Sequence, residues 1–332
     1  MENLGRFALA HAKNQQNEEQ KTVSKSRPAE VSGILIVHKH AGCTSHNIIS
    51  MCRRLYQTTQ VGHTGTLDPM ATGVLPVLIG RAVKASDYIM AEDKRYIAEM
   101  ELGYTTDTED STGTVLTHYE GTLPTPETVL ETCARFTGKI AQVPPMYSAL
   151  KVGGRKLVDL AREGVEVERE SRMVEIMALT CEPLPAEDGT VRKYRLDVSC
   201  SKGTYIRTLC ADIGKALGCG AVMSALTRVR TGNYTIDEAY TIDQLNEMTY
   251  EERLTLPRPV ETLFTELPEA HVSDFYAKLV RGGTELYQKR IHVDLEPGQL
   301  IRLYHRDTFF ALGKGDVLDG EKVVRPEKLF VL

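Results

Sequence analysis

The residue best suited to carry out chemistry is Asp68, the only acid in a loop of small residues at positions 62–73 (GHTGTLDPMATG). The glycines permit backbone conformations closed to other residues, Pro69 stiffens the turn, and the threonine hydroxyls can bond the local backbone. A carboxylate held this rigidly suits a nucleophile or general base that a bulky substrate approaches closely. The residues alone also fit a capped turn, in which Asp68 only bonds nearby N–H groups.

Two tyrosines and an arginine stand at the starts of predicted elements. Tyr96 opens a strand whose apolar side chains alternate through position 102, and on burial habits alone it fits a core tyrosine. Tyr205 and Arg207 begin a helix, predicted by its apolar stripe, that ends at Gly218. Backbone N–H groups and the helix dipole favour anions at such a start. On position alone, Arg207 fits a surface cation as well as a partner for an acid.

Further elements must position these side chains. An apolar run before the loop indicates a buried strand, and helical spacing with a Thr or Ser cap indicates the helix that leads into the loop. Turn-forming residues between two apolar runs near the C-terminus indicate a hairpin. The expected elements are a strand at 33–37, helices at 44–56 and 123–138, a strand ending near Ile79, a Pro/Gly-bounded loop at 142–156 and a hairpin around 305–307.

The composition is that of an ordinary globular protein. The chain has 332 residues, long enough for two domains, with 42% hydrophobic and 26% charged residues. No apolar run approaches the roughly 18 residues of a membrane span, and we see no signal peptide. The seven cysteines are scattered without a C-x-x-C pair, which argues against a disulfide framework or a zinc site. We therefore expect reduced thiols in a cytoplasmic protein that binds neither metal nor membrane.

Charge is unevenly distributed along the chain, whose formal net charge is −5. Residues 192–230 hold eight Lys or Arg against two acids, whereas residues 237–269 hold nine acids against two Arg. One basic face on an acidic body is compatible with a phosphate-contacting surface. A merely solvated basic strand and helix fits the same pattern about equally well.

The loop at 62–73 resembles the catalytic motif of the bacterial tRNA pseudouridine synthase B (TruB) family, in which the aspartate is the catalytic residue. Two more stretches resemble family motifs, D-K-x-Y at 93–96 and K-G-T-Y-I-R-T-L at 202–209. The strong resemblance covers about residues 31–230. His40 departs from the family pattern, which has a proline there, so we expect a looser turn before the first helix.

The resemblance implies a role for each residue singled out above. Asp68 becomes the catalytic carboxylate and Arg207 the ionic partner that keeps it ionised. Tyr96 becomes an active-site ring on which the target base stacks. His63 fills the space that the flipped base leaves in the RNA loop, and an insertion at about 139–162 folds over the RNA stem-loop. The expected substrate-binding residues are His63, Tyr205 beneath the base, Leu226 as a wall of the base pocket, Lys84, and Lys151 and Arg155 as phosphate contacts.

The implied fold is α+β, with a mixed, mainly antiparallel sheet flanked by helices and a small C-terminal β domain similar to the RNA-binding PUA domain. The expected boundaries are a disordered polar extension at 1–30, a catalytic domain at 31–262 and the PUA-like domain at 263–332. The motifs of the last segment are weak, and a purely structural cap accounts for them nearly as well.

The implied activity is that of an isomerase, a tRNA pseudouridine synthase that converts the T-loop uridine at position 55 of tRNA into pseudouridine. Such an enzyme must flip the base out of the folded loop, and the isomerisation needs no cofactor. We expect a cytoplasmic monomer whose partner is the T-arm stem-loop of tRNA, with no guide RNA and no membrane.

Three alternatives stay open on the sequence alone. An RNA-binding folding chaperone with a vestigial site would leave Asp68 without a chemical role. A nucleoside or glycoside hydrolase would need a second carboxylate, for which Asp110 is the one candidate nearby. A guide-RNA-dependent relative is disfavoured by the Pro/Gly-bounded loop at 142–156, which favours direct recognition of a stem-loop.

Overall fold

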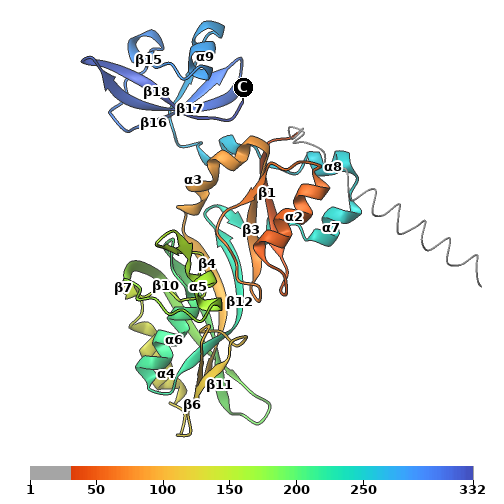
Figure 1. The fold of residues 1–332 in the computed structure, drawn as a ribbon, viewed down its shortest axis with the longest axis vertical. Helices are drawn as coiled ribbons and strands as arrows, with labels where there is room; N and C mark the ends of the chain where they lie inside the picture. The colour runs from red at the N-terminus through yellow and green to blue at the C-terminus, as the bar shows by residue number, and fades with distance from the viewer. Residues whose placement is uncertain (1–30, 332) are drawn as a thin grey trace, which may run out of the picture.

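A mixed sheet of nine strands forms the centre of the larger part of the protein (Figure 1). The computed structural model describes residues 31–331, so the predicted extension at 1–30 lies outside the described residues. The strands of this sheet are β1 (Gly33–Lys39), β2 (Val61–His63), β3 (Thr72–Ile79), β4 (Lys94–Leu102), β7 (Gly138–Gln142), β10 (Arg172–Pro185), β11 (Val191–Cys200), β12 (Ala221–Thr231) and β13 (Tyr234–Thr235).

The strand order is β1-β3-β12-β4-β11-β10-β7, with β2 beside β3 and β13 beside β12. Neighbouring strands are antiparallel except β3 and β12, which run parallel where Thr72 and Gly73 lie opposite Thr227 and Arg228. The predicted mixed, mainly antiparallel sheet is therefore confirmed. The parallel pair brings β12 alongside the end of the loop that carries Asp68.

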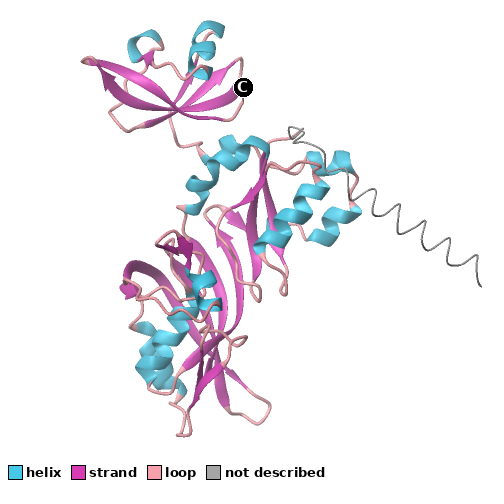
Figure 2. Cartoon of the chain, in the orientation of Figure 1, coloured by secondary structure: helices cyan, strands magenta, loops and turns pink. Residues whose placement is uncertain are grey.

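Helices cover the sheet in two groups (Figure 2). Beside β1 and β3 lie α2 (Ser45–Leu55), α7 (Ile242–Glu247) and α8 (Tyr250–Leu254), whereas α4 (Pro126–Ala134) and α6 (Ile206–Leu217) lie over the part formed by β10 and β11. Shorter elements fill the connections: α3 (Ser86–Met90), the hairpin of β5 (Tyr104–Thr106) and β6 (Val115–His118), the hairpin of β8 (Lys151–Val152) and β9 (Arg155–Lys156), and α5 (Leu157–Arg162).

The two helices that flank the site begin and end as predicted. Thr44 caps α2: its hydroxyl accepts from the Asn47 N–H at 3.1 Å, and the Asn47 amide oxygen accepts from the Thr44 N–H at 2.9 Å. This reciprocal pair satisfies two N–H groups that a helix start leaves without partners. At the end of α6, Gly218 adopts a left-handed conformation with φ of 75°, which a glycine accepts without steric cost.

Helix α4 is shorter than the predicted span of 123–138. Thr125 caps the helix, and Pro126 occupies the first helical turn, where its missing N–H is not needed. The C-terminal end comes early because β7 starts at Gly138, whose φ is 98°. Pairing of β7 with β10 takes the chain away from the helical path.

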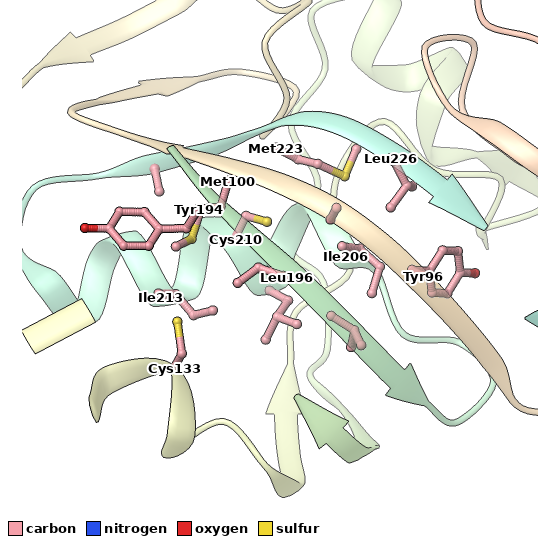
Figure 3. Packing of buried hydrophobic residues seen from close by; sticks show 14 of the residues in the cluster. Tyr96, Met100, Cys133, Tyr194, Leu196, Ile206, Cys210, Ile213, Met223 and Leu226 are labelled. Carbon is pink, nitrogen blue, oxygen red and sulfur yellow. The ribbon is translucent and has the colours of Figure 1, made fainter. Parts of the chain in front are cut away.

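The largest buried cluster in this part lies between α6 and the sheet (Figure 3). Alternate side chains of β4 point into it, among them Tyr96 and Met100, which confirms the predicted strand face. Ile206 and Ile213 enter the cluster from α6. Burying a large apolar side chain contributes about 1.5–3 kcal/mol, so this packing fixes the start of α6 against the sheet.

A second, five-stranded sheet forms the C-terminal part, with order β14-β16-β17-β18-β15 and helix α9 (Asp274–Arg281) beside it. The predicted hairpin is present: β16 and β17 join through Arg306 and Asp307, both with positive φ. The ring of Phe264 packs against those of Tyr88 and Phe309, in a cluster shared with the first part of the chain. The five strands are β14 (Glu269–His271), β15 (Leu286–Tyr287), β16 (Leu300–His305), β17 (Thr308–Leu318) and β18 (Glu321–Leu329).

Candidate active site

Asp68 lies in the loop between β2 and β3, and the peptide just before it is fixed by a buried serine. The Ser45 hydroxyl accepts from the Leu67 N–H at 2.9 Å and donates to the Leu67 carbonyl at 3.2 Å. Ser45 is the first residue of α2 and is buried, as is Leu67. The strands on either side of the loop, β2 and β3, pair with each other, so the loop that carries the carboxylate is closed at its base by a strand pair.

Lys39 holds the other side of the loop. Its ammonium group donates to the Pro69 carbonyl at 3.2 Å and to the Ala71 carbonyl at 2.6 Å, and the residue is fully buried. Burial lowers the pKa of Lys39, whereas the nearby Asp68 carboxylate raises it. Lys39 therefore stabilises the turn that follows Asp68.

Arg228 is a second buried cation under the same loop. Its Nε donates to the Val74 carbonyl at 2.8 Å and its Nη2 to the Gly65 carbonyl at 3.0 Å, and only 1% of its surface is exposed. The backbone of Arg228 leaves no room for a side chain at Gly73, where a Cβ atom would meet the Arg228 carbonyl oxygen at 2.2 Å. Gly73 also has a φ of 103°, so glycine is required there on both counts.

Arg207 grips the Asp68 carboxylate at two points. Its Nε lies 2.9 Å from one carboxylate oxygen and its Nη2 donates to the other at 3.3 Å. The side chain of Arg207 is 5% exposed, whereas that of Asp68 is 31% exposed. This geometry orients the carboxylate and leaves part of it open to an approaching substrate.

Three other groups surround the Arg207 guanidinium. It donates to the Thr108 carbonyl at 3.0 Å and to the Tyr147 carbonyl at 2.8 Å, and an Asp110 oxygen lies 3.8 Å away. Asp110 is buried, and its other oxygen accepts from the Thr112 N–H at 2.9 Å. Asp110 therefore faces the cation and the loop, so it is not the second open carboxylate that a hydrolase would need.

The pKa of Asp68 is raised above its ordinary value, because burial outweighs the favourable charge of Arg207. Arg207 is the largest influence that lowers this pKa, Lys39 also lowers it, and Asp110 raises it. The expectation that Arg207 favours the ionised form therefore holds for its own contribution. The net direction of the pKa is nevertheless upward, because the loop that orients Asp68 also removes water from its carboxylate.

Tyr96 and Leu226 belong to the buried apolar cluster that reaches the residue before Asp68, and Figure 3 shows both side chains in this cluster. Both are buried members of the cluster that contains Leu67, and they come from the paired strands β4 and β12. Burial raises the pKa of the Tyr96 hydroxyl, and Arg228 lies opposite Tyr96 in the register of these strands. The structure therefore brings Tyr96 and Leu226 to the site, although both are more buried than a freely accessible stacking surface.

Tyr205 and His63, the other two predicted residues near the site, are both partly buried. Tyr205 is half-buried and directly precedes α6, two residues before Arg207. His63 ends β2, and its Nδ1 is buried without a hydrogen-bond partner within residues 31–331. Burial, followed by the charges of Arg228 and His46, lowers the pKa of His63, which favours the neutral imidazole.

The remaining three predicted residues lie apart from Asp68. Lys151 and Arg155 are exposed on the β8–β9 hairpin, where Arg155 pairs with Glu163. Lys84 is exposed in the short helix at Gly80–Ala85 and lines a cavity of about 400 Å³ together with Gly283 and other residues of the C-terminal part. These cations would therefore take part only by contacting parts of a large substrate that lie away from the group at Asp68.

The sequence did not indicate the residues that fix the backbone around the site through hydrogen bonds. Ser45 was expected only as a possible cap of the helix at 44–56, and Arg228 was only counted among the basic residues of 192–230. Gln142, whose side chain bonds the backbone of Tyr205, was given no role at all. A buried polar side chain next to a motif was the available signal, because such groups need partners.

The fold resembles that of a protein that acts in an RNA complex. A chain in the solved structure of an H/ACA RNP bound to a substrate RNA containing 2′-deoxyuridine matches with a TM-score of 0.62 and 25% identity. The match covers 90% of this chain and 85% of that chain.

No helix within residues 31–331 is long and apolar enough to cross a membrane.

The sequence matches define the class as pseudouridylate synthases, which are isomerases. The model of the N-terminal domain of TruB family pseudouridylate synthases matches residues 53–206, and that of the tRNA pseudouridylate synthase B C-terminal domain matches residues 207–265. The tRNA pseudouridine synthase B of Clostridium perfringens (strain 13 / Type A) is 40% identical over 91% of this chain and 99% of its own length. That of Bacillus pumilus (strain SAFR-032) is 43% identical over 77% of this chain and 84% of its own. The chain belongs to the TruB family.

Proposed function

We propose that the protein isomerises the T-loop uridine of tRNA to pseudouridine, with Asp68 as the catalytic carboxylate. The observation that carries this proposal is the pairing of a partly open Asp68 with a buried Arg207, at a contact of 2.9 Å. Tyr96 and Leu226 supply an apolar floor beside this pair, and the relatives named above are tRNA pseudouridine synthases.

The reaction breaks the bond between the sugar C1′ and the base N1, turns the uracil, and forms a bond between C1′ and C5. The hydrogen on C5 leaves as a proton and N1 gains one, so substrate and product contain the same atoms and electrons. The base must first leave the RNA loop, at a cost of a few kcal/mol that stacking and edge hydrogen bonds offset. Asp68 is rigidly placed to react with the sugar or base, and Arg207 stabilises its ionised form.

The supporting roles follow from where each side chain lies. Tyr205, at the rim, is suited to stack under the flipped uracil, and Tyr96 and Leu226 to wall the pocket. A neutral His63 is suited to stack in the RNA loop, because its low pKa removes the cost of burying a charged ring. Lys151 and Arg155 on their exposed hairpin, and Lys84 at the C-terminal part, are suited to contact phosphates.

For the domains, we propose a catalytic domain at 31–262 with an RNA-clamping insertion at 139–162, and an RNA-binding PUA-like domain at 263–332. A separate five-stranded sheet in the last segment supports this division. We further propose that the insertion recognises the T-arm stem-loop directly, without guide RNA, in a cytoplasmic monomer. The structural neighbour is an RNP, so the guide-dependent alternative needs its own arm in the experiment.

The proposal is tested by mapping pseudouridine in an unmodified tRNA transcript after incubation with the purified protein alone. Carbodiimide labelling followed by primer extension should give one new stop, at the T-loop uridine. The matched control is a transcript with cytidine at that position, which should give no stop. Modification at another uridine, or activity only after guide RNA is added, would contradict the proposed substrate.

A further inference from the structure

Gln142, the last residue of β7, makes two hydrogen bonds to a single backbone residue at the site. Its Nε2 donates to the Tyr205 carbonyl at 3.0 Å, and its Oε1 accepts from the Tyr205 N–H at 2.8 Å. The residue is only 2% exposed. A primary amide offers a donor and an acceptor side by side, so it can satisfy both groups of one residue as a neighbouring strand would.

The bonded residue, Tyr205, is where the backbone enters α6. It has an extended conformation, with φ of −103° and ψ of 111°, and no side chain caps this helix start. Its carbonyl also accepts the first helical bond, from the Leu209 N–H at 3.0 Å. Arg207 follows two residues later, so the direction of the Tyr205 backbone decides where the Arg207 guanidinium points.

The chain that follows Gln142 returns to the same helix start. Tyr147, five residues farther on, accepts from Arg207 through its carbonyl at 2.8 Å. Arg169 donates to the Pro144 carbonyl at 3.0 Å and closes the base of this segment. The insertion is thus joined to α6 at two points, Tyr205 and Arg207.

From this geometry we propose that Gln142 is a positioning residue for the isomerisation. It fixes the Tyr205 backbone to the root of the insertion and so aims the Tyr205 ring at the base and the Arg207 guanidinium at Asp68. The inference rests on the proposed function, because it assigns Gln142 an effect on turnover at that site. Gln142 itself touches neither substrate nor Asp68, and it acts through Tyr205 and Arg207.

Two substitutions of similar size separate positioning from packing. Gln142→Leu removes both hydrogen bonds at every pH; it leaves the Tyr205 N–H without a partner, whereas the Tyr205 carbonyl keeps the bond from the Leu209 N–H. Gln142→Glu keeps the acceptor for the Tyr205 N–H, but an ionised carboxylate has no donor for the Tyr205 carbonyl. A protonated Glu at this position has that donor again, and burial favours the protonated form.

The charged groups around Gln142 do not obscure this contrast. Arg172, which lies opposite Gln142 in β10, is present in the wild type and in both variants, as is Arg207, so the contrast between Leu and Glu at position 142 does not arise from them. Any change in the titration of Asp68 that follows from losing the Gln142 support occurs in Gln142→Leu as well, so the Gln142→Glu ratio is compared with the Gln142→Leu ratio at each pH. The hydroxyl of Tyr205 has a raised pKa because of burial, so it stays neutral.

The experiment measures kcat and KM for the wild type, Gln142→Leu and Gln142→Glu on a T-arm stem-loop, from about pH 5.5 to about pH 8.5. We expect Gln142→Leu to lose about tenfold in kcat at every pH, which corresponds to about 1.4 kcal/mol in the activation free energy, with little change in KM, because Gln142 acts on the placement of Tyr205 and Arg207. We expect the Gln142→Glu to wild-type ratio of kcat to rise toward one as the pH falls. Thermal unfolding at each pH verifies that each variant is folded where it is assayed.

Three results would overturn the inference. A kcat ratio for Gln142→Glu that does not change with pH would exclude rescue through the donor. Full kcat in Gln142→Leu would show that Tyr205 needs no such support. An inactive wild type would overturn the proposed function together with this inference. An active wild type with a Gln142→Glu ratio of kcat that does not change with pH would overturn only the role of Gln142.

Discussion

At the scale of single residues, the site combines one reactive acid with a support that removes its freedom. Ser45 and Lys39 fix the backbone on either side of Asp68, and Arg207 fixes the carboxylate itself. The same enclosure raises the pKa of Asp68. A carboxylate that is less stable in its ionised form is a stronger base, so orientation and reactivity arise from the same burial.

The raised pKa predicts the acid side of the pH profile. Asp68 acts in its ionised form, so kcat/KM is lost as the pH falls through the folded pKa, which lies above the ordinary 3.8 of an aspartate. Arg207→Gln removes the largest influence that lowers this pKa, so the acid limb should move to higher pH. The measurement is kcat/KM against pH, with Arg207→Lys as the control because it keeps the charge and should shift the limb less. An acid limb at the same pH in all three proteins would contradict this account.

How far the site could be predicted depends on where the information lies in the chain. Asp68 and Arg207 stand in long, specific motifs, so sequence alone indicated both. Gln142 contacts a residue that lies 63 positions away in the sequence, and Arg228 contacts one that lies 154 positions away. No local sequence pattern indicates such pairs. The net pKa of Asp68 was also out of reach, because it depends on burial by several loops.

At the scale of elements, the first turns of α2 and α6 supply residues that hold Asp68: Ser45 is the first residue of α2, and Arg207 is the second residue of α6. Thr44 and Gly218 are local signals at the ends of these helices, so both helices were predictable. The end of α4 was not, because pairing of β7 with β10 competes with the helix from across the sheet. The parallel contact of β3 with β12 gives the loop that carries Asp68 its second support, from Arg228.

This support predicts a large effect at Gly73. Gly73→Ala forces a Cβ atom to within 2.2 Å of the Arg228 carbonyl at a φ of 103°, so the free energy of unfolding should fall by at least about 3 kcal/mol. Gly189→Ala is the matched control: its φ is 79°, but nothing lies within 4 Å of the added atom. There we expect a loss of about 1–2 kcal/mol from backbone strain alone. Equal losses in urea unfolding would show that β12 does not confine the loop.

At the scale of the whole molecule, two sheets are joined by an aromatic cluster, and charge is divided between regions. Phe264 contacts Tyr88 of the first part and Phe309 of the C-terminal sheet, with ring centroids 4.9 and 6.0 Å apart, so these rings link the two parts. The chain has a net charge of −5, yet residues 192–230 are strongly basic. An RNA partner would therefore meet local cations rather than the average charge.

This division predicts how RNA affinity depends on salt. Lys151 is exposed and forms no ion pair within residues 31–331, so Lys151→Ala should weaken T-arm binding and reduce the slope of log K against log salt by about 0.7–0.9. Arg258→Ala is the control, because Arg258 lies in the acidic segment and pairs with Glu238 at 2.6 Å. An unchanged slope for Lys151→Ala, or an equal change for Arg258→Ala, would move the RNA-binding face elsewhere.

The most direct test of the central claim is tritium release from a T-arm stem-loop labelled at C5 of uracil, with wild type and Asp68→Asn compared at equal RNA occupancy. Forming the C1′–C5 bond expels the C5 hydrogen, so we expect full release with the wild type and none with Asp68→Asn, although both bind the RNA. Release by Asp68→Asn at the wild-type rate would contradict a catalytic role for this carboxylate. RNA binding without release by either protein would favour an RNA-folding chaperone instead.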